Sequence, residues 1–302
     1  MPATRMHDDE FEIDDALVEG LVASQFPEWA HLPLTRFDSA GTVNAIYRLG
    51  EDLSVRLPLR PGQATQIERD RRWLPYLAPR LPVAIPEPLA VGAPTEAYPS
   101  EWAIYRWLPG EPLTDVAVED PRQLALDLAA FVLALQSLDP SDGPPPSADN
   151  YRRGAPLGPR DASARAGIEA LQGVIDPEAA TRIWEAALAA PGWDGPPTWL
   201  HGDLMPGNLL VQDGRLSAVI DFGALGVGDP ACDMIPAWLS LPASVRGDYR
   251  AALGVDDATW TRGRGWALWV ALVGLPYYRD TNPAFVRILQ RGIDAVLGDP
   301  EG

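Results

Sequence analysis

The chain has 302 residues, 46% hydrophobic and 22% charged, which is ordinary for a globular protein with one large domain or two lobes. Its formal net charge of −18 argues against a nucleic-acid partner or an anionic membrane surface, because both favour a basic face. All 24 basic residues are arginines, so a Walker-type phosphate loop, which needs lysine, is excluded. The acidic start of the chain, the lack of a long apolar run and a single cysteine predict a cytoplasmic protein without a disulfide.

The first hundred residues predict one helix followed by a β-rich segment. Apolar residues recur at helical spacing over residues 12–26, with Asp14 as the cap and Pro27 at the end. The elements expected beyond it are strands at 45–50 and 52–59 joined as a hairpin, a helix at 66–78 and a strand at 101–108. Pro75 is a candidate for an early end of the second helix.

Beyond the turn sequence "PGEP" at 109–112 the chain becomes mostly helical. The helical stretches are residues 121–138, 177–190, 262–275 and 284–297. One hairpin interrupts them, because Asp213-Gly214 between two apolar runs is a strong two-residue turn signal. The sequence therefore predicts an α+β fold of two lobes. These are a small β-rich lobe over residues 1–105, a hinge over 106–110 and a larger, mostly helical lobe over 111–302.

Polar residues concentrate in "HGDLMPGN" at 201–208, between two apolar segments that are typical of buried strands. Asp203 and Asn208 share this short loop, and the following hairpin returns Asp221 beside it. Phosphoryl transfer needs a carboxylate to accept the proton of an attacking hydroxyl and oxygen ligands for magnesium. The spacing therefore predicts Asp203 as the catalytic base and Asn208 and Asp221 as Mg²⁺ ligands.

"HGDLMPGN" followed by "VIDFG" resembles the catalytic and metal-binding loops of the aminoglycoside phosphotransferase family, small-molecule kinases related to protein kinases. In this family the first loop begins His-Gly-Asp, where most protein kinases have His-Arg-Asp. The resemblance implies a protein-kinase-like fold, ATP or GTP as the phosphoryl donor and Mg²⁺ as cofactor. It also implies that His201 supports the catalytic loop and that Asp233, in "GDPACDM", braces this loop from a helix.

Each half of this motif has a plain structural explanation when taken alone, since Asp and Asn cap loops and Asp-Phe-Gly forms turns. Their order and the hairpin between them favour the phosphotransferase. Three histidines in the whole chain are too few for a two-metal phosphatase. The lack of a Gly-x-Ser-x-Gly elbow argues against a serine hydrolase.

Kinase-like enzymes hold the α- and β-phosphates with a strand lysine that pairs with a helix glutamate, and this chain has no lysine. Arg56 matches the lysine position, and a guanidinium can grip phosphate through two bonds. Asp70 matches the glutamate best because Leu74 and Leu77 continue its helical face, while Glu68 remains an alternative. The other interpretation of Arg56 is an ordinary solvated strand residue.

The remaining nucleotide contacts have weaker signals. A phosphate-binding loop is expected between the first helix and the first long strand, although it has one glycine, and a plain turn explains it nearly as well. Its candidate donors are Ser39, Gly41 and Thr42. Backbone groups from Arg106 to Leu108 are expected to contact the base of the nucleotide. Tyr105 is at the position that limits the back of the nucleotide-base pocket. In some antibiotic kinases of the resembled family, a bulky aromatic there goes with GTP use.

The acidity of the predicted larger lobe suits a cationic, hydroxylated acceptor such as an amino sugar, although solubility explains the charge equally well. We expect an O-phosphotransferase that moves the γ-phosphoryl of Mg-bound ATP or GTP to a hydroxyl of an aminoglycoside-like or other antibiotic. One alternative is a metabolic kinase of a small alcohol such as choline or homoserine. Another is a nucleotide-binding pseudokinase without turnover.

Overall fold

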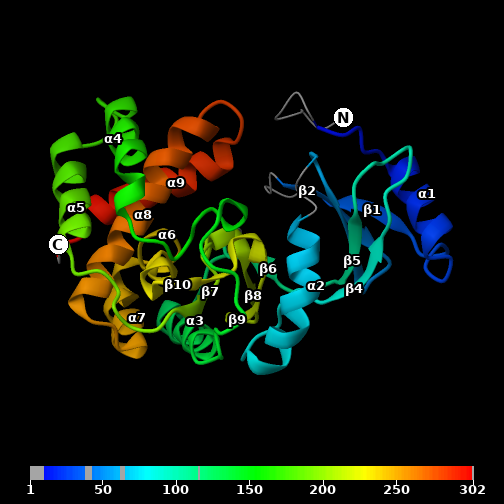
Figure 1. Cartoon of the computed structure of the whole chain (residues 1–302), viewed down its shortest axis with the longest axis horizontal. Coiled ribbons are helices and arrows are strands. Elements are labelled where there is room, and N and C mark those ends of the chain that lie inside the picture. Colours follow the sequence, from blue (N-terminus) through cyan, green and yellow to red (C-terminus); the bar gives the residue numbers. More distant parts are fainter. Residues whose placement is uncertain (1–9, 38–42, 62–64, 115, 301–302) are drawn as a thin grey trace. The chain divides into compact units, whose positions relative to one another are not determined.

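The computed structural model describes residues 10–37, 43–61, 65–114 and 116–300. The chain divides into two compact units, Met1–Arg80 with Ala84–Pro109, and Leu81–Val83 with Gly110–Gly302 (Figure 1). Each unit has its own core of buried apolar side chains. The candidate phosphate-loop residues Ser39, Gly41 and Thr42 lie outside the described residues.

The first unit is built on an antiparallel sheet with a helix on each face. Its strands, in the order β1-β2-β3-β5-β4 across the sheet, are Leu34–Phe37, Asn44–Leu49, Leu53–Pro58, Trp102–Arg106 and Pro88–Gly92. Helix α1 (Asp15–Gln25) packs Val18 and Leu21 against Trp102 and Ile104 of β5. Because side chains alternate along a strand, Ala103 and Tyr105 face the other way, where Ile67 of α2 (Thr65–Leu77) covers them. One face of the sheet therefore packs against α1 and the other against α2.

The sequence predicted both helices of this unit, and the alternative of an early end at Pro75 does not occur. Asp14 caps α1 as expected, since its carboxylate accepts from the N–H of Leu17 at 2.8 Å. Helix α2, however, continues through Pro75 to Leu77. Pro75 lies in the last turn, where it removes one N–H, and the complete burial of Leu74 and Leu77 keeps this turn packed.

The second unit is mostly helical. Its longer helices are α3 (Pro121–Gln136), α4 (Asp161–Ala170), α5 (Pro177–Ala189), α7 (Arg246–Leu253), α8 (Asp257–Tyr278) and α9 (Pro283–Leu297), with a short α6 (Pro236–Leu239). Periodicity located α3, α5, α8 and α9 but missed α4 and α7. Segments such as "DASARAGIEA" have too few large apolar residues to show a helical stripe, and packing holds them in place, α4 against α8 and α7 against α3.

Two small sheets of the second unit position the polar loop at 201–208. Strand β7 (Thr198–Leu200) pairs with β10 (Gly226–Gly228), and β8 (Leu209–Gln212) lies between β6 (Glu111–Pro112) and β9 (Arg215–Val219). The predicted β8–β9 hairpin is confirmed, and its turn residues Asp213 and Gly214 have φ of 51° and 76°. Positive φ at both positions is the twist that a two-residue hairpin turn requires.

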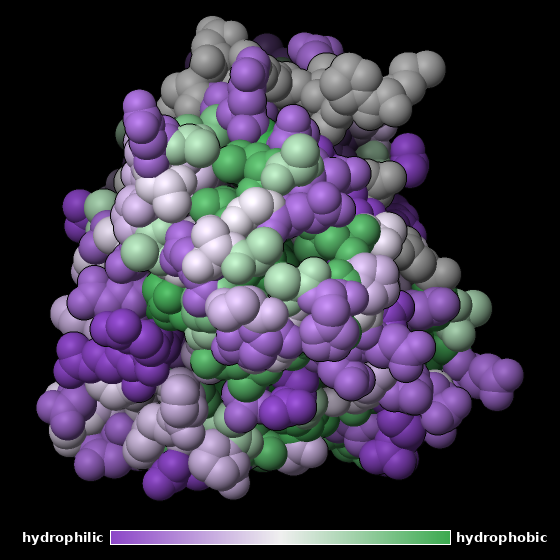
Figure 2. Space-filling model, turned by 90° about the vertical axis from the view of Figure 1, so that its right-hand side faces the viewer, coloured by the Kyte–Doolittle hydropathy of each residue, from purple (hydrophilic) through white to green (hydrophobic). Residues whose placement is uncertain are grey.

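These observations confirm the predicted α+β, kinase-like class, with an antiparallel sheet in one unit and helices dominating the other. On the face drawn in Figure 2, hydrophilic residues cover most of the surface and hydrophobic patches lie between them. None of the helices in the described ranges has the length and apolar character needed to cross a membrane.

Candidate active site

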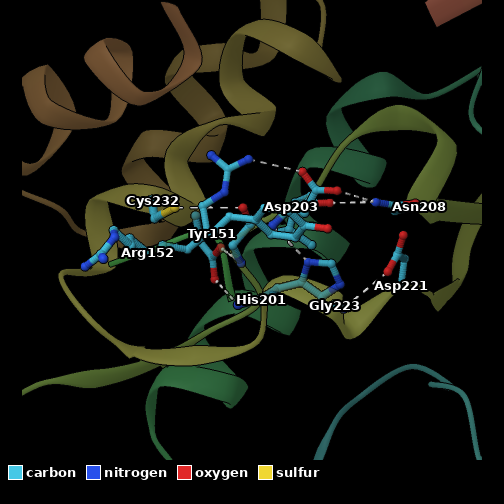
Figure 3. A network of polar contacts seen from close by, with 12 residues as sticks. Tyr151, Arg152, His201, Asp203, Asn208, Asp221, Gly223 and Cys232 are labelled. Atoms are coloured by element: carbon cyan, nitrogen blue, oxygen red, sulfur yellow. Dashed lines mark hydrogen bonds and ion pairs between the residues drawn. The ribbon is translucent and has the colours of Figure 1, made fainter. Parts of the chain in front are cut away.

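The loop after β7 folds back on itself through Asn208. Asp203 follows the end of β7 by three residues, and Asn208 ends a 3-10 turn, Pro206–Asn208, directly before β8. The Asn208 side-chain nitrogen donates to the Asp203 carbonyl at 2.9 Å and to the Asp203 Oδ2 at 3.1 Å. Figure 3 shows the two side chains turned toward each other. One amide therefore fixes both the backbone and the carboxylate of Asp203.

Asp221 reaches the same place from the end of the hairpin. The N–H of Ile220 donates to the Asn208 carbonyl at 2.9 Å, which ties the residue before Asp221 to the loop. Asp221 has φ of 61°, and its Oδ1 accepts from the N–H of Gly223 at 3.2 Å. A non-glycine residue in this left-handed region is uncommon and often marks a functional position. The structure thus brings together Asp203, Asn208 and Asp221 as the sequence spacing predicted (Figure 3).

His201 joins the loop to the end of β9. Its Nδ1 accepts from the N–H of Asp203 at 3.2 Å, so Nε2 carries the proton and donates to the Ile220 carbonyl at 3.1 Å. The ring is fully buried, with the ring of Phe222 4.6 Å away edge to face. Burial lowers the pKa of His201 to about 4, and therefore the imidazole is neutral at physiological pH. This histidine is placed to orient neighbouring backbone groups.

Asp233 holds the start of the loop from a 3-10 helix, Pro230–Met234. Its two carboxylate oxygens accept from the N–H of His201 at 2.8 Å and the N–H of Gly202 at 2.7 Å. The side chain is completely buried, and burial raises the pKa of Asp233 to about 6, although the two backbone bonds lower it. The carboxylate satisfies two backbone donors that would otherwise be buried without partners.

The carboxyl of Asp203 lies partly shielded, with 32% of its side chain exposed. Burial raises the pKa of Asp203 to about 6, while the nearby Arg153 lowers it, Asp221 raises it and the Asn208 bond lowers it. Arg153 Nη2 lies 3.6 Å from Asp203 Oδ1. Sequence reasoning missed Arg153, because it is fifty residues away in a proline-rich loop without a motif. At neutral pH Asp203 is ionised and can accept a proton.

The oxygen atoms at this site suit a hard cation. No cluster of three or more His, Cys, Asp or Glu side chains in the described ranges forms a metal site on its own. Magnesium prefers oxygen ligands and keeps several waters and substrate phosphates, so one carboxylate and one amide oxygen suffice from the protein. The amide nitrogen of Asn208 is engaged by Asp203, which leaves its oxygen to serve as the ligand. Asn208 and Asp221 therefore fit a magnesium site.

In the first unit, Tyr105 contacts both residues that were expected to form the phosphate-binding pair. Its hydroxyl donates to Asp70 Oδ2 at 2.9 Å, and the Arg56 guanidinium carbon lies 4.4 Å from its ring centroid. Asp70 is 4% exposed, whereas Glu68 is exposed on the same helix. Arg56 is on β3 and Tyr105 on the adjacent β5, on the face covered by α2. The sequence named these residues without showing that the tyrosine links the other two.

In the stretch 106–108, which was expected to contact the nucleotide base, two backbone N–H groups already donate hydrogen bonds within the first unit. The N–H of Arg106 donates to the Glu87 carbonyl at 3.0 Å, and its Nε donates to Glu87 Oε2 at 2.7 Å. The N–H of Trp107 donates to the Asp52 carbonyl at 2.7 Å. Leu108 follows as a half-buried residue outside any strand.

Comparison with known proteins identifies the family. The model of the phosphotransferase enzyme family matches residues 35–266. The chain belongs to this family. The predicted resemblance and the predicted phosphotransferase class are therefore confirmed.

Solved structures of antibiotic phosphotransferases have the same fold as this family member. The GDP complex of aminoglycoside 2'-phosphotransferase-IIIa has a TM-score of 0.70 at 19% identity, covering 95% of this chain and 99% of that one. The GDP and kanamycin complex of APH(2")-IIIa gives 0.69 at 18% identity, covering 93% and 97%. Macrolide 2'-phosphotransferase MphH from Brachybacterium faecium gives 0.60 at 25% identity, covering 95% and 98%.

One curated protein shows a short local match. Lysine-specific demethylase JMJ21 of Arabidopsis thaliana is 38% identical over 65 residues, which are 18% of this phosphotransferase and 7% of the demethylase. The chain thus spans a small fraction of that relative, and the match carries no inference about activity.

We predict that Asp233→Asn loosens the catalytic loop. Asparagine offers one acceptor oxygen where aspartate offers two, so one buried N–H of His201 or Gly202 loses its partner. The free energy of unfolding in urea should fall by about 1–3 kcal/mol. The control is Asp248→Asn, which removes an exposed ion pair with Arg122 and should cost about 0.5 kcal/mol or less. Equal denaturation midpoints for the two variants would contradict the bracing role.

Proposed function

We propose that this phosphotransferase moves the γ-phosphoryl group of Mg-bound ATP or GTP to a hydroxyl group of a small-molecule antibiotic, with Asp203 as the base. The observation that carries the proposal is the convergence of Asp203, Asn208 and Asp221 on one rigidly held loop and hairpin end. In this proposal the first unit binds the nucleotide, and the second unit supplies the catalytic groups and binds the acceptor.

In this proposal the ionised carboxylate of Asp203 receives the proton of the acceptor hydroxyl. As the acceptor oxygen bonds to the γ-phosphorus and the bond to the leaving nucleoside diphosphate breaks, the hydroxyl proton passes to the Asp203 carboxylate. The Asn208 bond to Oδ2 keeps the carboxylate oriented while this happens. Asn208 and Asp221 would hold magnesium, which neutralises charge on the transferring phosphates. Asp203 thus needs only to be ionised and aimed, and both conditions agree with its surroundings.

In the first unit we assign phosphate binding to Arg56. Its guanidinium lies over the ring of Tyr105, and its Nε has no hydrogen-bond partner among the described residues. Asp70 orients this arrangement through the Tyr105 hydroxyl. Candidate donors to phosphates remain Ser39, Gly41 and Thr42, and the base contacts remain assigned to Arg106 and Leu108. Among the solved relatives, one is a GDP complex and another is ADP-bound, which supports a nucleotide donor of either base.

The acceptor class rests on the relatives and on charge. Kanamycin is bound in one structural relative, and another is named as a macrolide phosphotransferase. Both kinds of antibiotic carry hydroxyls and basic amines, which suit a protein of net charge −18. A cationic, hydroxylated antibiotic is therefore the acceptor that we propose.

The proposed function is tested by measuring the release of ADP from ATP, or of GDP from GTP, in the presence of each acceptor of a panel. The panel contains kanamycin and other aminoglycosides, macrolides, peptide antibiotics and simple amino alcohols. Turnover with an antibiotic supports the proposal. Turnover with a simple amino alcohol alone points to a metabolic kinase. Tight nucleotide binding without turnover for any acceptor points to a pseudokinase.

We expect Asp203→Asn to abolish transfer while leaving nucleotide binding nearly intact. The amide is close in size to the carboxylate but cannot accept the hydroxyl proton, so kcat should fall about 10²–10⁴-fold. Nucleotide affinity, measured by calorimetry, should change less than about threefold, because a base acts on the acceptor. The matched control is Asp213→Asn, in the exposed turn of the same hairpin, which should keep normal turnover. Near-native turnover of the Asp203 variant would refute the assignment.

Substitution of the two proposed metal ligands should weaken magnesium-dependent nucleotide binding. Asn208→Ala and Asp221→Ala each remove one protein oxygen, so the Mg²⁺ concentration for half-maximal turnover should rise about tenfold or more. The measurement is turnover against Mg²⁺ at fixed nucleotide, with Asp213→Ala as control. If both variants keep the wild-type magnesium dependence, the metal lies elsewhere.

Arg56→Lys should not replace the arginine. Lysine keeps the charge but loses the flat guanidinium that stacks on Tyr105 and contacts phosphate at two points. We expect kcat/KM for the nucleotide to fall about tenfold, equivalent to about 1.4 kcal/mol. Arg36→Lys is a fitting control, since Arg36 also lies over a tyrosine, Tyr47, in the same sheet. An Arg56→Lys enzyme as active as the control would mean that the phosphates are anchored by other residues.

A further inference from the structure

Arg153 is a buried cation to which the proposed reaction assigns no role. The residue is 7% exposed, and its Nη2 lies 3.6 Å from Asp203 Oδ1. Within the described ranges, its Nε and Nη1 have no hydrogen-bond partner. Burying a guanidinium with incomplete hydrogen bonding is costly. The position of this residue therefore calls for an explanation beyond stability.

The backbone that carries Arg153 is held in an unusual conformation. Tyr151, Arg152 and Gly154 have φ of 55°, 52° and 75°. Side-chain-bearing residues seldom adopt this left-handed region, and two in succession require support from their surroundings. Arg160 provides it, because its Nη2 donates to the carbonyls of Tyr151 at 2.6 Å and Arg152 at 2.9 Å. The backbone on both sides of Arg153 is thus held in place.

Gly202 leaves the space that Arg153 occupies. Gly202 has φ of 79°, and a Cβ there would lie 2.9 Å from the Arg153 Cβ and 2.9 Å from the Ala224 carbonyl oxygen. Most protein kinases have arginine at this position of the loop, in His-Arg-Asp. Here the loop has glycine, and Arg153, from a distant segment of the chain, packs against it.

Aromatic rings hold the guanidinium from its other sides. Its carbon lies 5.5 Å from the ring centroid of Trp266 and 5.4 Å from that of Trp269, both on α8. The Trp266 and Trp269 rings meet edge to face at 5.7 Å, so they form one rigid wall. Arg153 is therefore confined between this wall and the Asp203 carboxylate.

We propose that Arg153 is a positioning residue for the catalytic base, which fixes Asp203 Oδ1 while Asn208 fixes Oδ2. The inference rests on the proposed role of Asp203. A carboxylate held at both oxygens cannot rotate about its χ2 angle, so it presents a constant lone pair to the acceptor hydroxyl. Arg153 has no need to touch nucleotide or acceptor for this role.

The experiment compares Arg153→Met and Arg153→Lys with Arg152→Gln. Arg152 is the adjacent, exposed residue, and in Figure 3 its side chain points away from Asp203. Turnover of Mg-ATP and Mg-GTP is measured with the acceptor from the panel and, independently of it, with water. We expect Arg153→Met to lower kcat about 30-fold or more, with the KM values for nucleotide and acceptor each within about threefold of wild type. Arg153→Lys should recover part of the loss in kcat. Arg152→Gln should behave as wild type. A loss of binding alone, or an unchanged kcat in both Arg153 variants, overturns the inference.

Asp203→Asn separates this inference from the proposed function. If the Asp203→Asn enzyme turns over normally, the assignment of the base fails. If it is inactive while Arg153→Met is fully active, only the positioning role fails. In the Asp203→Asn background, Arg153→Met should cause no further loss of kcat, because it acts through the carboxylate. Melting temperatures identify an unfolded variant. If Arg153→Met does not fold, Arg153→Gln, which also removes the charge, is measured in its place, and a wild-type kcat of that variant refutes the role.

Discussion

The site depends on two hydrogen bonds that one buried carboxylate accepts from consecutive backbone N–H groups. Asp233 accepts from His201 and Gly202, and its own carbonyl accepts from the hydroxyl of buried Tyr249 at 2.9 Å. A shift of the loop would leave a buried donor or the carboxylate without its partner, and either loss is costly. Asp203, one residue further on, inherits this fixed position. The backbone before Asp203 is therefore held from outside the loop, whereas Asn208 orients the Asp203 carboxylate from within it.

Much of this site was predictable, because the signals were local. Asp213-Gly214 fixes a hairpin from two residues, and that hairpin alone brings Asp221 back to Asn208. Contacts that depend on packing between distant segments were not predictable. The approach of Arg153 to Asp203 depends on a strained loop and on the absence of a side chain at Gly202, which no periodicity reveals. Helix α4 escaped prediction for the same reason, because its packing against α8 replaces a strong apolar stripe.

The first unit shows the same division. Arg56 was placed on its strand by its match to the lysine of kinase-like enzymes, and Asp70 on the inner side of α2 because Leu74 and Leu77 continue its helical face. The link through Tyr105 requires the register between β3 and β5, in which Ser54 lies opposite Tyr105. Arg56 follows two residues later on the same face, within reach of the ring. A sequence without aligned relatives gives no means to derive that register.

A chain without lysine has to use arginine wherever it needs a cation, and the structure uses arginine in two ways. Arg262 is buried, and all three of its nitrogens donate hydrogen bonds, to both oxygens of Asp229 and to the Pro191 carbonyl. Arg56 and Arg153 instead lie over aromatic rings, and each has at least one nitrogen without a partner in the described part of the chain. A delocalised guanidinium tolerates this state better than an ammonium, because its weak hydration and flat faces suit a ring. Arg262 thus stabilises the fold. Arg56 and Arg153 retain unused bonding capacity, Arg56 at the position proposed to bind phosphate and Arg153 beside the Asp203 carboxylate. At both positions the arginine is combined with an aromatic surface, Tyr105 for Arg56 and Trp266 with Trp269 for Arg153.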